Sequence, residues 1–129
     1  MRIEHVAMWT EDLERLATFY SAYFGAVVGK KYENRAKGFE SRFLSFDSGT
    51  RLEIMRTTAL SAVKHDSSAH RMGLTHLAFA IGSERGVDEL TSRLRRDGHP
   101  ILDGPRRTGD GYYESIVLDP DGNRVEVTA

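Results

Sequence analysis

Two stretches of the chain repeat each other, and each repeat carries one His and one Glu at matching positions. His5 opens the run His-Val-Ala-Met, and His76 opens the run His-Leu-Ala-Phe 71 positions later (76 − 5). Glu53 lies in Arg-Leu-Glu-Ile, and Glu126 lies in Arg-Val-Glu-Val 73 positions later (126 − 53). A duplication that keeps two imidazoles and two carboxylates favours one site for a divalent metal ion, because both groups are common ligands of such ions.

The same order of expected elements occurs in both halves of the chain. Alternating apolar residues predict strands, and apolar residues three and four positions apart predict one amphipathic helix in each half. The first helix is expected over 11–24, between an N-cap at Thr10 and a C-cap at Gly25, and the second between Ser83 and Gly98. The expected strands are 2–9, 26–33, 41–47, 51–56, 73–81, 99–103, 112–118 and 124–128. Each half therefore reads βαβββ, and the predicted fold class is α+β.

Length favours one domain, or two small halves that share a core. We expect module 1 at about 1–56, a linker at 57–72 and module 2 at about 73–129. The glycine-rich residues 104–111 are predicted to form a mobile loop near any pocket.

Composition excludes several classes of function. The chain has no cysteine, which rules out disulfides, zinc–thiolate sites and a cysteine nucleophile. The formal net charge is −1 and no basic patch dominates, so nucleic acid is not an expected partner. No apolar run reaches the roughly 18 residues of a membrane helix, so no membrane partner is expected either. We therefore expect a soluble cytoplasmic protein.

The alternation along the last strand of each half separates an apolar face from a face that carries Glu. Leu52 and Ile54 share one face, and Glu53 points to the other; Val125 and Glu126 are opposed in the same way. We expect the apolar faces to pack against the helices and the two Glu residues to line a concave surface.

A single His or Glu on a strand is more often structural, but four of them at duplicated positions favour a ligand set. Imidazole and carboxylate ligands without thiolate suit Ni, Co, Zn, Mn or Fe. An ion that prefers six ligands would keep two positions for water or substrate and would act as a Lewis acid. The carboxylates would then be placed to transfer protons.

Three runs give the chain a resemblance to a known family: Ile-Glu-His-Val-Ala at 3–7, Phe-Tyr at 19–20 with Phe-Gly at 24–25, and Leu-Asp-Pro-Asp-Gly-Asn-Arg-Val-Glu at 118–126. Over essentially its whole length the chain resembles the vicinal oxygen chelate superfamily of glyoxalases, bleomycin resistance proteins and extradiol dioxygenases. The resemblance implies two paired βαβββ modules that form an open barrel-like cup, and it implies a homodimer. It also implies that the first and last strands of each module supply the metal ligands, here His5, Glu53, His76 and Glu126.

The order His-Glu-His-Glu is most similar to glyoxalase I of the nickel-using bacterial kind. That resemblance implies one divalent metal ion per site, with Ni or Zn favoured, and a lactoylglutathione lyase-type isomerisation through a metal-stabilised enediolate. Glu126 would be the shuttling base and Glu53 its partner. Trp9 stands where glyoxalase I carries an Arg that helps to hold glutathione, so another small molecule with adjacent oxygens is an open alternative.

The expected substrate pocket is lined by Trp9, Met55, Tyr112, Tyr113 and Arg106. Two other functions remain open on the sequence. One is a different metalloenzyme of the superfamily, namely a thiol transferase, an epimerase or a dioxygenase. The other is a non-catalytic protein that binds a small molecule, as in resistance by sequestration.

Overall fold

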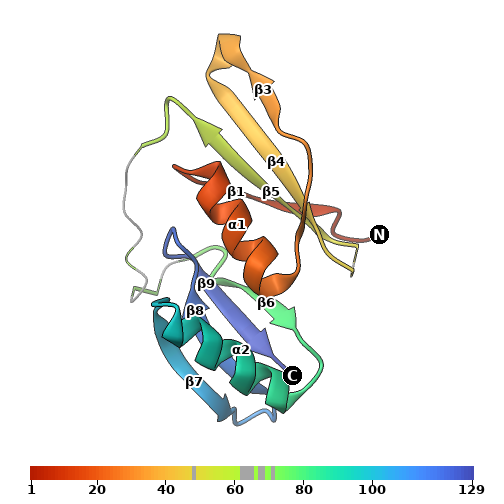
Figure 1. Cartoon of the computed structure of the whole chain (residues 1–129), viewed down its shortest axis with the longest axis vertical. Helices are drawn as coiled ribbons and strands as arrows, with labels where there is room; N and C mark the ends of the chain where they lie inside the picture. Colours follow the sequence, from red (N-terminus) through yellow and green to blue (C-terminus); the bar gives the residue numbers. More distant parts are fainter. Residues whose placement is uncertain (48, 62–65, 67–68, 71) are drawn as a thin grey trace. The chain divides into compact units, whose positions relative to one another are not determined.

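The computed structural model describes residues 1–47, 49–61, 66, 69–70 and 72–129. The chain divides into two compact units, residues 1–63 and 64–129. Each unit has one mixed β-sheet with one α-helix packed on it (Figure 1). The α+β class and the βαβββ order of both halves are therefore confirmed. The predicted linker 57–72 lies partly outside the described residues.

In the first unit the predicted strand 26–33 is divided into two short pieces. The elements are β1 (His5–Trp9), α1 (Leu13–Phe24), β2 (Val27–Val28), β3 (Tyr32–Asn34), a 3-10 turn η1 (Arg35–Lys37), β4 (Phe39–Ser45) and β5 (Arg51–Thr57). Both pieces pair with β4: Val27 lies opposite Ser45, and Tyr32 lies opposite Ser41. The sheet order is β1-β5-β4-β2, with β1 parallel to β5 and the other pairs antiparallel.

Helix α1 begins two residues later than predicted, and the expected N-cap at Thr10 is wrong. The carboxylate of Asp12 accepts a hydrogen bond from the Arg15 backbone N–H at 3.0 Å, which makes Asp12 the N-cap. The buried Thr10 hydroxyl instead accepts from the Asp12 N–H at 3.1 Å, a local turn that leads into the helix. Gly25 ends α1 with φ 67°, as predicted, and its N–H donates to the Tyr20 carbonyl.

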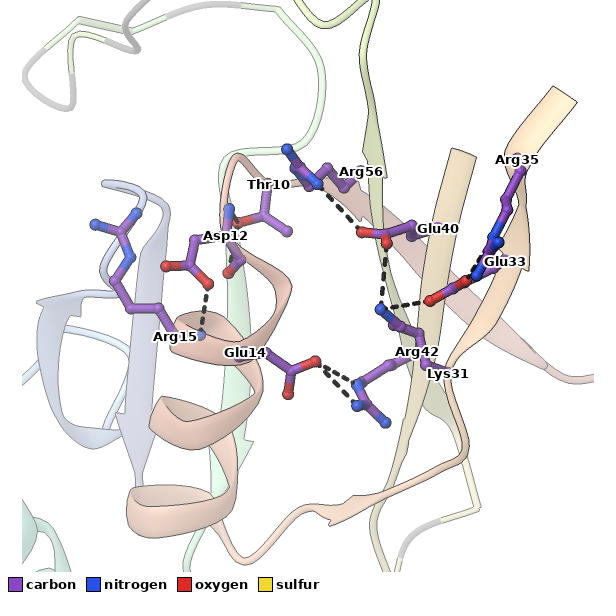
Figure 2. A network of polar contacts seen from close by, with 10 residues as sticks. All are labelled: Thr10, Asp12, Glu14, Arg15, Lys31, Glu33, Arg35, Glu40, Arg42 and Arg56. Atoms are coloured by element: carbon purple, nitrogen blue, oxygen red, sulfur yellow. Dashed lines mark hydrogen bonds and ion pairs between the residues drawn. The ribbon is translucent and has the colours of Figure 1, made fainter. Parts of the chain in front are cut away.

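The core of the first unit lies between α1 and one face of the sheet. Leu16 and Tyr20 of α1 are fully buried, as are Leu44 and Ile54 of the sheet. The same face carries charged residues at its margins, and Arg42 Nη2 reaches Glu14 on α1 at 2.9 Å (Figure 2). The predicted contact between the apolar strand face and the helix is confirmed.

The second unit repeats this arrangement. Its elements are β6 (His76–Ala80), α2 (Glu84–Arg96), β7 (Ile101–Arg107), β8 (Tyr113–Leu118) and β9 (Arg124–Thr128), in the sheet order β6-β9-β8-β7. Ser83 caps α2 as predicted, because its hydroxyl accepts from the Gly86 N–H at 3.1 Å. Val87 and Leu94 of α2 are fully buried, as are Val117, Val125 and Val127 of the sheet.

The predicted loop at 104–111 is wrong in its first half. Residues 104–107 belong to β7, the edge strand that pairs with β8, and Arg106 lies opposite Glu114. The strand accommodates Pro105 because its register shifts on both sides of Asp103, and proline is tolerated in edge strands and at bulges. The remaining turn is closed by Thr108, whose backbone N–H donates to the Tyr112 carbonyl at 2.8 Å.

The turn between β8 and β9 is organised by one buried carboxylate. Asp119 accepts hydrogen bonds from the backbone N–H groups of Asp121 and Asn123 and from the Asn123 side chain, at 2.9 to 3.0 Å. Gly122 supplies the positive φ of 85° that this tight turn requires. The turn sets the register that places Glu126 opposite Ile116. Neither α-helix among the described residues is long and apolar enough to cross a bilayer.

Candidate metal centre

His5 and Glu53 lie together on the sheet face of the first unit that is turned away from α1. This open face of unit 1 is formed on its two neighbouring strands by His5, Ala7 and Trp9 of β1 and by Arg51, Glu53 and Met55 of β5. The parallel register pairs Ala7 with Glu53, so the His5 and Glu53 side chains are diagonal neighbours. Nε2 of His5 lies 3.8 Å from Oε2 of Glu53.

The other nitrogen of the His5 ring is held by Glu4. Nδ1 of His5 contacts Oε2 of Glu4, and the other oxygen of Glu4 contacts Arg51. The hydrogen bond with His5, followed by the contact with Arg51, lowers the pKa of Glu4. Phe43 packs edge-on against the His5 ring, with centroids 5.4 Å apart. A carboxylate that accepts from Nδ1 leaves the Nε2 lone pair free for a ligand role, as in carboxylate–histidine–metal arrangements.

His76 and Glu126 repeat this geometry in the second unit. Ala78 lies opposite Glu126 on the parallel pair β6–β9, and Nε2 of His76 lies 3.5 Å from Oε2 of Glu126. Thr75 stands where Glu4 stands in the first unit, and its hydroxyl lies 3.2 Å from Nδ1 of His76. Both His residues thus direct Nε2 toward the Glu of their own unit.

Each His–Glu pair fits the ligand chemistry of a divalent metal ion. Two donor atoms held about 2.1 Å from one ion at angles of about 90–110° are about 3.0–3.4 Å apart. The two Nε2–Oε2 separations, 3.8 Å and 3.5 Å, are slightly longer than this range. The structure brings the four predicted ligands together as two pairs; among the described residues it forms no cluster of three or more metal-ligating side chains.

Glu114 is a candidate site residue that the sequence prediction missed. It lies on β8, opposite Thr128 and Arg106, on the same sheet face as Glu126, and it is buried. Burial and then the adjacent charge and hydrogen bond of Glu126 raise the pKa of Glu114. The signal was present in the sequence, because a hairpin closed at Asp119–Asn123 aligns Glu114 diagonally with Glu126.

The five predicted pocket residues occupy different places. Trp9 and Met55 lie opposite each other on the open face of unit 1, beside Glu53. Arg106 lies on the face of unit 2 that carries Glu126 and pairs with Asp103 at 2.5 Å. Tyr113 alternates with Glu114 and points to the opposite face, where its hydroxyl donates to Asp88 of α2 at 2.7 Å. Tyr112 lies in the turn before β8 and is exposed.

Known proteins resemble the chain along nearly its full length. The model of the Glyoxalase/Bleomycin resistance protein/Dioxygenase superfamily matches residues 2–127. The uncharacterized protein YqjT of Bacillus subtilis is 26% identical over 98% of both chains. The lactoylglutathione lyase GLX1 of Arabidopsis thaliana is 28% identical, and the match covers 98% of this chain and 43% of that enzyme. The trypanothione-dependent glyoxalase I of Leishmania major superposes with a TM-score of 0.77 at 25% identity, covering 99% of this chain and 86% of that one. The chain therefore belongs to the glyoxalase/bleomycin resistance protein/dioxygenase superfamily.

Proposed function

We propose that the chain is a metal-dependent enzyme that isomerises a small molecule with adjacent oxygens, in the manner of glyoxalase I. The protein would bind one divalent metal ion, with Ni or Zn favoured. Its four ligands would be His5, Glu53, His76 and Glu126. The observation that carries the proposal is the repeated His–Glu pair, in which Nε2 faces the carboxylate at 3.8 Å and 3.5 Å. The relatives named lactoylglutathione lyase support the reaction class.

The protein's own groups have separate tasks in this proposal. When bound, the ion supplies Lewis acidity toward the substrate oxygens. Glu126 would act as the base that takes a proton from the hydroxyl-bearing carbon next to the carbonyl and returns it to the carbonyl carbon. The hydroxyl proton passes to the former carbonyl oxygen, so that no atom is gained or lost. Glu53 would be its partner in the proton transfer. Glu4 and Thr75 keep the two imidazoles oriented by their contacts with Nδ1.

Metal content is the first test. We expect about one transition-metal ion per chain by elemental mass spectrometry, lost in the double variant Glu53→Ala, Glu126→Ala. The matched control is Glu11→Ala, Glu89→Ala, which removes two carboxylates from exposed positions. A wild-type protein that stays metal-free after reconstitution with Ni or Zn contradicts the proposal.

Activity is the second test. The metal-loaded protein is mixed with the hemithioacetal of methylglyoxal and glutathione, and thioester formation is followed by ultraviolet absorbance. We expect turnover that Glu126→Gln reduces by at least about a hundredfold while metal is retained, because general-base catalysis contributes about 10²–10⁴-fold. Turnover that survives in the metal-free protein would refute the metal-dependent mechanism.

A further inference from the structure

A group of large apolar side chains continues the open face of unit 1 beyond Glu53. The aromatic patch consists of Trp9 on β1, Met55 on β5, Phe39 on β4 and Tyr32 on β3. The registers place Trp9 opposite Met55, Met55 opposite Ser41, and Ser41 opposite Tyr32, so the residues share one face. Met55 is two residues from Glu53 on the same strand, which corresponds to roughly 7 Å.

The rings of the patch contact one another across the sheet. The centroids of Trp9 and Phe39 are 6.2 Å apart in an edge-to-face arrangement, although β5 lies between their strands. Tyr32 packs against Phe39 with the same centroid separation. Trp9 is nevertheless 48% exposed and Tyr32 is 56% exposed. Such an arrangement leaves a rigid apolar surface accessible, and exposed apolar patches of this kind mark binding sites.

Several charged residues of unit 1 lie on the face of the sheet opposite to this patch. Lys31, Glu33, Glu40 and Arg56 pair with one another on the helix side of the sheet (Figure 2). Arg42 of β4 and Arg56 of β5 lie on the helix face, so among the described strand residues whose side chains lie on the open face Arg51 is the one arginine or lysine. It lies opposite His5, stacks over Phe43 at 4.0 Å and contacts Glu4. Arg51 and Met55 are four residues apart, about 13 Å along β5.

We infer that the patch binds an uncharged, apolar and preferably aromatic group of the substrate, while the oxygens of the same molecule reach the metal beside Glu53. This inference rests on the proposed function, because the His5–Glu53 pair defines the polar end of the same surface. Ala7 contributes only a methyl group between His5 and Trp9, so the polar and apolar ends are continuous. A carboxylate group would find no basic partner at the Trp9 end among the described residues of this face.

The test compares two chelators with the same pair of adjacent oxygens, acetohydroxamate with a methyl group and benzohydroxamate with a phenyl group. Trp9 is the single tryptophan of the chain, so intrinsic fluorescence reports on the patch directly. For the zinc-loaded protein we expect benzohydroxamate to bind about tenfold more tightly, with a change in Trp9 emission, because ring contacts add to the apolar area buried. Trp9→Leu has no tryptophan, so its two Kd values are measured by isothermal titration calorimetry; the substitution should abolish most of this preference without changing the Kd of acetohydroxamate.

The matched control is Val27→Ala, which removes an exposed apolar side chain from the same sheet at the far end of β4. It should leave both Kd values unchanged. Equal affinity for the two chelators in the zinc-loaded protein would overturn the inference and leave the proposed metal centre intact. Loss of the preference in Val27→Ala as well would also overturn it.

A metal-free arm separates this inference from the proposed function. If the protein takes up no zinc, Trp9 emission is titrated with benzamide and with acetamide. Saturable quenching by benzamide alone supports the patch while the metal proposal fails. No saturable change overturns the inference. One further outcome also overturns the inference. If Trp9 emission depends on protein concentration and Trp9→Leu converts a dimer to a monomer, a second copy of the chain covers the patch.

Discussion

Glu114 and Glu126 lie diagonally across the β8–β9 pair, on the same face of the sheet of unit 2. Two charged carboxylates that are neighbours on one sheet face repel each other, which favours a proton on one of them. Burial first, and the charge of Glu126 second, raise the pKa of Glu114, while Arg106 opposes this effect. The residue proposed as the base, Glu126, therefore lies beside a carboxyl group, Glu114, whose own protonated form is favoured.

Glu114→Gln should stabilise the metal-free protein at neutral pH. A carboxyl group whose pKa is raised by folding contributes most to the free energy of unfolding at pH values below its unfolded pKa of about 4.3. This contribution is lost as the pH rises through the folded pKa. The glutamine amide keeps a donor toward Glu126 without a charge. We expect a gain of about 1 kcal/mol at a pH of about 7.5 that disappears near pH 4, measured by urea unfolding. Glu89→Gln, at an exposed site on α2, is the control, and equal effects of the two variants would contradict the prediction.

Glu4→Gln should weaken metal binding without removing a ligand. The carboxylate of Glu4 holds Nδ1 of His5 and pairs with Arg51. Loss of such an orienting partner costs about 10–100-fold in metal affinity. A zinc titration with a competing chelator measures the change, and Glu11→Gln serves as the control. An unchanged zinc affinity would show that Glu4 does not position the ligand.

The hydroxyl of Tyr113 should titrate at higher pH than an ordinary tyrosine because it donates to Asp88. This hydrogen bond, followed by burial and the negative charges of Asp88 and Glu84, raises the pKa of Tyr113. The protonated Tyr113 hydroxyl stabilises the folded protein at pH values below the unfolded tyrosine pKa of about 10. This contribution to the free energy of unfolding is lost as the pH rises through the folded pKa. Asp88→Asn should lower the pKa of Tyr113, as observed by NMR of 13C-labelled tyrosine. Asp97→Asn, at the other end of α2, should leave it unchanged.

A buried pair of hydroxyl groups joins α2 to the sheet of unit 2. Oγ of Ser115 lies 2.6 Å from Oγ1 of Thr91, which also donates to the Val87 carbonyl at 2.6 Å. Thr91→Val leaves the Ser115 hydroxyl without this partner and should cost about 1–3 kcal/mol of unfolding free energy. The double variant Thr91→Val, Ser115→Ala should lose less than the sum of the two single variants, because no buried polar group is then left unpaired. Additive losses in urea unfolding would show that the two hydroxyl groups do not interact.

Local patterns in the sequence determined most of the secondary structure. The alternation in 51–56 and 124–128 correctly assigned Leu52, Ile54, Val125 and Val127 to the buried faces. Gly25 and Ser83 marked their helix ends because a left-handed glycine and a capping hydroxyl act on neighbouring residues. The duplication of the His–Glu pattern predicted which four residues to examine, and their joint role as metal ligands stays a prediction.

Contacts between distant residues were decided by the tertiary structure. Thr10 and Asp12 are both acceptable helix caps by sequence, and the buried position of Thr10 left the cap to Asp12. The strand position of residues 104–107 depends on pairing with β8, which no local pattern in a glycine- and proline-containing segment reveals. The proximity of His5 to Glu53 follows from the parallel register of β1 and β5. Period-two alternation specifies the face of a side chain, whereas register depends on how the whole sheet packs against its helix.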